Sequence, residues 1–145
     1  MIVQLLIGAA LILATTVVAG LGFLVIEIAL NRFHRWLIRP PHAIKMLALL
    51  CIAVSWFLLI VSISVWIWGL AFLGLGLFSA TEEAVYFAIV SFTTLGFGDI
   101  LLPQDWRLLS GMASINGLLM IGLQTAMLIE ILRRVRSVQG KIGSG

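Results

Sequence analysis

The chain has 145 residues, 62% of them hydrophobic, and a mean hydropathy of +1.20. Soluble domains average roughly 45–50% apolar residues, so this composition excludes an ordinary water-soluble domain and indicates an integral membrane protein in a lipid bilayer. The formal net charge is +3. The basic residues flank apolar runs and form no solvated face, so they act as topology signals and indicate no nucleic-acid partner.

The first apolar run extends from Ile2 to Leu30 and predicts an extra N-terminal transmembrane helix within residues 1–31. At 1.5 Å per residue it is long enough to cross a hydrocarbon core of about 30 Å. No basic region precedes it, and it exceeds the apolar core of about 7–15 residues found in signal peptides, so we expect no cleavage. Glu27, close to its end, is predicted to pair with Arg32 or His34 at the interface.

Residues 32–43 break the apolar pattern with basic side chains and the pair Pro40-Pro41, which cannot continue a helix. We expect a short cytoplasmic connector here. The next apolar run is too long for one span of about 20 residues and becomes rich in glycine toward its end. It predicts an outer helix over residues 44–69, followed by a turret over residues 70–78.

Tryptophans mark the outer end of this helix. Trp66 and Trp68 lie where an aromatic belt at the outer membrane interface is expected.

A short helix is predicted over residues 80–92. Ser79 and Glu82 have the spacing of a capping box, in which each side chain bonds the other residue's amide. The segment is too short to span a membrane, so it must be a re-entrant helix shielded by protein. The negative end of its dipole lies near Phe92 and favours a nearby cation.

The last apolar segment predicts a transmembrane helix over residues 107–132, and residues 134–145 form a basic, glycine-containing tail. Four of the nine basic residues lie in 32–45 and four in 133–141. Short cytoplasmic loops attract Lys and Arg, so both clusters are expected in the cytoplasm. That requires the chain to dip into the membrane after residue 80 and return. We therefore predict three spans in the plasma (cell inner) membrane, with the N-terminus outside and the C-terminus cytoplasmic.

The stretch Thr94-Leu95-Gly96-Phe97-Gly98-Asp99 follows the short helix. Two glycines one residue apart can hold alternating backbone conformations, so that successive carbonyl oxygens point toward one axis. Such neutral, hard oxygens suit an alkali cation. A dinucleotide-binding loop would need a preceding strand and a third glycine, but position 101 is Leu. The stretch is therefore interpreted as an ion selectivity filter.

These six residues resemble the potassium-channel signature, with Leu95 where Val or Ile is usual and Phe97 where Tyr is commonest. The similarity covers residues 44–133 and implies the tetrameric pore fold of that family. The fold class expected is thus all-α: three transmembrane helices plus a re-entrant pore helix and a filter loop. In this family the filter oxygens of residues 94–98 coordinate potassium, which implies potassium at Thr94, Leu95, Gly96 and Phe97, completed by Gly98.

The resemblance also assigns residues outside the filter. Asp99 is placed at the extracellular pore mouth, and Gly117 matches the hinge glycine of the inner helix. Three residues at helical spacing are expected to line the cavity: Leu118, Ile121 and Thr125. Asn116 is expected to make an interhelical hydrogen bond.

The function implied is passive, potassium-selective conduction through a homotetramer. One alternative is a non-conducting or weakly selective cation-channel-like subunit. Another is a potassium transporter subunit, although such proteins carry four pore-like repeats in one chain and this chain has one. No paired His, Cys or carboxylate cluster falls on one helical face, so no enzyme activity is expected. No cofactor is expected, and potassium ions are the permeant ligand.

Overall fold

A computed structural model describes residues 1–32 and 42–140. The described residues form four helices and one short 3-10 turn: α1 (Ile2–Arg32), α3 (His42–Gly74), α4 (Thr81–Phe92), η1 (Gln104–Trp106) and α5 (Arg107–Gly140). Three of the helices, α1, α3 and α5, are long and apolar enough to cross a membrane. The chain is therefore an all-α membrane protein with three membrane-spanning helices and one short helix, as the sequence predicts.

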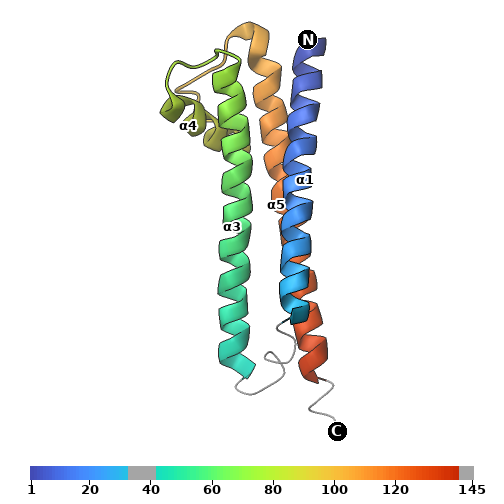
Figure 1. Cartoon of the computed structure of the whole chain (residues 1–145). Coiled ribbons are helices and arrows are strands. Elements are labelled where there is room, and N and C mark those ends of the chain that lie inside the picture. Colours follow the sequence, from blue (N-terminus) through green and yellow to red (C-terminus); the bar gives the residue numbers. More distant parts are fainter. Residues whose placement is uncertain (33–41, 141–145) are drawn as a thin grey trace.

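The three long helices lie side by side, and α4 packs against one end of α3 (Figure 1). The segment between α3 and α5 starts and finishes at this same end, so residues 75–106 dip and return without crossing to the other end. The amino terminus of α1 also lies there, and the carboxyl end of α5 lies at the opposite end (Figure 1). Most of the connector predicted at residues 32–43, including His34, falls outside the described residues.

Helix α1 is attached to α3, η1 and α5 by polar contacts along its whole length. Near the start of α1, Gln4 Nε2 donates to the Asp105 carbonyl, and further along Asn116 Nδ2 donates to Thr15 Oγ1 at 2.8 Å. Toward the other end, Trp56 Nε1 donates to the Gly22 carbonyl at 3.1 Å and Arg134 Nη1 donates to Glu27 at 2.8 Å. The predicted interhelical bond of Asn116 is confirmed. The buried residues of α1 are small, namely Gly8, Thr15, Ala19 and Gly22, which lets the neighbouring helices approach closely.

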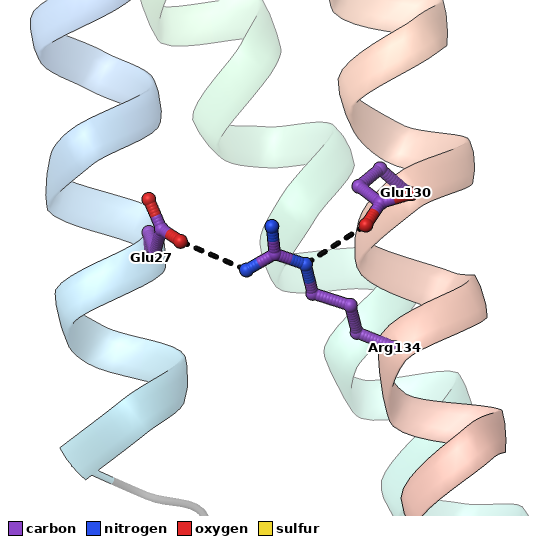
Figure 2. Close-up of polar contacts among 3 residues, drawn as sticks. All are labelled: Glu27, Glu130 and Arg134. Atoms are coloured by element: carbon purple, nitrogen blue, oxygen red, sulfur yellow. Dashed lines mark hydrogen bonds and ion pairs between the residues drawn. The ribbon is translucent and has the colours of Figure 1, made fainter.

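Of the two partners predicted for Glu27, His34 lies outside the described residues and Arg32 is wrong, because Glu27 pairs with a residue of α5. Its carboxylate lies 2.8 Å from Arg134 Nη1 on α5, and the Nε of the same guanidinium bonds Glu130 at 2.9 Å (Figure 2). Arg32 is five residues further along α1, about 140° round the helix, so it projects from a different face. The Arg134 side chain is half exposed, so solvent screens this ion pair and we expect it to contribute little to stability.

Helix α3 continues past its predicted end at residue 69, as far as Gly74. Gly69 does not stop the helix: a Cβ there would lie 3.2 Å from the Val85 Cα, so this glycine allows close approach to α4. The helix ends at a left-handed Gly76 (φ 70°), with the Leu77 amide bonded to the Phe72 carbonyl at 3.1 Å. That is the Schellman pattern of helix termination.

Helix α5 starts at residue 107 as predicted but continues beyond residue 132, to Gly140. Residues 133–139 contain neither proline nor glycine, so no helix-breaking residue interrupts α5 between its predicted end and Gly140.

The placement of Trp68 in an interfacial belt is wrong, because its side chain is fully buried, whereas Trp66 is half exposed. Trp68 belongs to an aromatic cluster that joins α3 to α4. Ring centroids lie 5.8 Å apart for Trp68 and Phe72, and 5.3 Å apart for both Phe72–Phe87 and Phe78–Phe87. Tilted and edge-to-face pairs of this kind contribute about 0.5–1.5 kcal/mol each beyond the area they bury. The cluster fixes α4 on the carboxyl-terminal end of α3.

The predicted capping box at the start of α4 is also wrong. The N-cap residue is Ala80, one position later than expected, and no side chain caps the helix. The Ser79 hydroxyl is therefore one residue too early to accept from the first-turn amides. Glu82 and Glu83 still lie in the first turn, where the helix dipole favours acidic side chains.

We predict that Gly117→Ala disrupts the packing of α5 on α4. A Cβ at residue 117 would lie 1.7 Å from the Phe92 carbonyl oxygen, and a backbone atom cannot rotate away. Overpacking typically costs about 1–3 kcal/mol, which a thermal melt in detergent would detect as a lower transition temperature. The control is Gly111→Ala in the same helix, where a Cβ meets no atom within 4 Å. Equal transition temperatures for the two variants would contradict the packing described here.

Candidate ion-conducting site

The turn after α4 fixes the direction of the backbone amides that begin the filter segment. The amides of Thr93 and Thr94 donate to the carbonyls of Ile89 and Ser91, both at 2.9 Å. The amides of residues 95 and 96 both donate to the Val90 carbonyl, at 3.0 and 3.4 Å. Four consecutive N–H groups therefore point back at the last turn of α4.

The backbone from residue 94 to residue 98 alternates in conformation. Thr94, Gly96 and Gly98 have positive φ angles of 59°, 56° and 78°, and the residues between them do not. Glycine adopts this left-handed region without a steric penalty, as expected for Gly96 and Gly98. Thr94 is β-branched, and holding it there costs about 1–3 kcal/mol, the kind of local strain that clusters at functional sites.

The carbonyl oxygens of this segment have no hydrogen-bond partner within the part of the chain that the structure describes. Among the described residues, no hydrogen bond ends on a carbonyl oxygen between Thr94 and Gly98. Every residue from 93 to 99 is exposed, with Leu95 at 55% and Phe97 at 67%. The segment thus lies at the surface of the single chain, with carbonyl oxygens that are not engaged in hydrogen bonds among the described residues.

Asp99 is held by a residue that the signature alone does not indicate. The Tyr86 hydroxyl on α4 donates to Asp99 Oδ2 at 2.7 Å. This hydrogen bond lowers the pKa of Asp99, because it stabilises the carboxylate, and it raises the pKa of the Tyr86 hydroxyl, because the proton is held. Tyr86 is the only tyrosine in the chain, and its place on α4 is the one sequence signal that could have identified it.

The residues predicted on α5 occupy two different positions. Gly117 lies directly against the carboxyl end of α4, so its missing side chain has a packing role. Helix α5 is continuous through this residue, and the proposed hinge stays a prediction. Leu118 and Ile121 are 60% and 50% exposed, and Thr125 is exposed too, so the three form an open face of the helix away from the buried Asn116.

The fold and the site together define a class: a membrane protein whose chain dips between two spanning helices and presents backbone oxygens on the returning segment. The chain belongs to the ion channel family, whose profile matches residues 46–134, more than half of its length. The match begins in α3 and ends in α5, so it includes the short helix and the filter segment and leaves out α1. No curated protein and no solved structure matches the chain.

We predict that Tyr86→Phe raises the pKa of Asp99. The lost hydroxyl is the main group that stabilises the carboxylate, so the variant carboxyl will bind its proton at a higher pH. The bond's contribution to stability is present above the ordinary carboxyl pKa and is lost as the pH falls through the lowered value. A carbon-13 NMR titration of aspartate-labelled protein measures both curves, with Asp99→Asn used to assign the signal. Superimposable Asp99 titration curves for wild type and Tyr86→Phe would show that the Tyr86 hydroxyl does not lower the pKa of Asp99.

Proposed function

We propose that this chain conducts potassium ions selectively and passively, as a homotetramer whose subunits each contribute one filter strand. The observation that carries the proposal is the run of partner-free carbonyl oxygens from Thr94 to Gly98, on a backbone that alternates in conformation. Neutral carbonyl oxygens replace the hydration shell of an alkali cation without trapping it by full charge. Potassium is assigned because of the resemblance of residues 94–99 to the potassium-channel signature.

The proposed subunit number follows from what one chain contains. One filter strand covers only one side of an ion, and the described residues contain a single such segment. A closed ring of identical strands needs a cyclic assembly, and four copies match the pore fold of the family. The exposed face with Leu118, Ile121 and Thr125 would then line a cavity below the filter, and Asp99 would stand at the pore mouth.

The helix dipole of α4 supports the same role. Its first turn holds Glu82 and Glu83, and its carboxyl end runs directly into the filter segment. The carboxyl end of a helix carries a partial negative charge, so a cation close to Phe92 is favoured. Four such helices around one axis would add their effects.

We predict that Gly96→Ala reduces potassium flux by about tenfold or more. A left-handed backbone costs an alanine about 1–2 kcal/mol in each subunit, which pulls residue 96 out of the conformation that aligns its carbonyl. Potassium and sodium uptake into liposomes measures both flux and selectivity. The matched control is Gly74→Ala, at a glycine with an ordinary φ and open space around it. Equal permeability of the unmutated protein to potassium and sodium would refute the proposed function.

We further propose that the N-terminus is outside the cell membrane and the basic ends of the helices are cytoplasmic. The eight clustered basic residues support this orientation. In a Cys51→Ser background, Ile2→Cys should react with a membrane-impermeant thiol reagent applied to intact cells, and Ser137→Cys only after permeabilisation. The reverse labelling pattern would overturn the orientation and leave the conduction proposal standing.

A further inference from the structure

One turn of α5 is held on two sides. The Asn116 side chain is fully buried and its Nδ2 donates to Thr15 Oγ1 on α1 at 2.8 Å. The next residue, Gly117, lies against the backbone of Phe92, the last residue of α4. Consecutive helical residues project about 100° apart, so one turn can face both neighbours at once. This turn of α5 therefore connects α1 to Phe92, the residue from which the chain continues into the proposed filter.

The contact with α1 is specific. Thr15 is also fully buried, and its hydroxyl is 2.9 Å from the Ile12 carbonyl and 3.2 Å from Asn116 Oδ1. A hydroxyl has one proton and two lone pairs, so it can donate to one of these acceptors and still accept from the Asn116 amide. Removing this hydroxyl leaves the buried amide without its acceptor, which costs free energy unless α5 moves.

The contact with α4 is a backbone contact. A Cβ on Gly117 would be 1.7 Å from the Phe92 oxygen and 2.6 Å from its carbonyl carbon, so little space separates the two main chains. Phe92 is 1% exposed, so it cannot move into open space. The residues that follow it form the turn whose amides bond the end of α4. A rotation of α5 therefore displaces the start of the filter.

We propose that Thr15 and Asn116 are positioning residues for the filter. Their hydrogen bond fixes the rotation of α5, which keeps Gly117 against the Phe92 backbone and so sets the geometry of the ion-binding carbonyls. This inference rests on the proposed function and extends it to α1, which lies outside the family match at residues 46–134. Helix α1 is thus a determinant of ion binding and does more than anchor the chain.

The test is isothermal titration of potassium into purified, detergent-solubilised protein, with choline as the balancing cation. Thr15→Val removes the hydroxyl and keeps the shape of the side chain. We expect the variant to bind potassium at least about threefold more weakly than the wild type. This fold-change corresponds to the average of ~0.6 kcal/mol for interhelical hydrogen bonds in membranes. Thr15→Ser retains the hydroxyl and should restore wild-type affinity.

Thr16→Val is the matched control, because Thr16 is exposed and, among the described residues, its hydroxyl bonds only the Ile12 carbonyl of its own helix, at 2.8 Å. A Thr15→Val protein that melts at a lower temperature but binds potassium like Thr16→Val would overturn the inference, since a purely structural role predicts that result. If Thr15→Val fails to assemble, Thr15→Ala carries the same expectation with less bulk. A wild-type protein that binds no potassium would instead refute the proposed function itself.

Discussion

An ion can leave water only where oxygen atoms without other partners replace its hydration shell. The carbonyl oxygens of residues 94–98, which we propose as the filter, accept no hydrogen bond from the described residues. The four N–H groups of residues 93–96 are bonded to the last turn of α4. Because each trans peptide unit holds its C=O opposite its N–H, the carbonyls of residues 92–95 are directed away from that turn. The arrangement requires a left-handed Thr94, a strained conformation for a β-branched residue. The rest of the chain must therefore hold the end of α4 firmly enough to maintain this strain.

Three sets of contacts provide that support. The aromatic cluster of Trp68, Phe72, Phe78 and Phe87 fixes α4 on α3, and Gly69 lets the two backbones approach. On the other side, α5 reaches the Phe92 carbonyl at Gly117. Helix α1 in turn holds α5 through a buried hydrogen bond and an ion pair at the far end (Figure 2). Two of these three supports depend on glycines placed where helices touch.

The sequence predicts those features that depend on local chemistry. The length of the apolar runs indicates the three spans, and the spacing of Gly96 and Gly98 indicates an alternating backbone. The sequence does not predict features that depend on which neighbouring helix a given helix face contacts. Trp68 is equally compatible with a membrane interface and with a packed core, and Gly69 with a helix end and with a close contact. The partner of Glu27 lies 107 residues away on α5, so no local rule could select it.

We propose that four copies of the chain place residues 94–98 around one axis, with their carbonyl oxygens facing it. A cryo-electron microscopy reconstruction of the purified protein in potassium tests this most directly. We expect a fourfold ring, with density for ions on the axis between the carbonyls of Thr94 to Gly98 and with α1 on the outside of α5. An assembly of another order, or a filter segment that faces lipid or another helix, would contradict it.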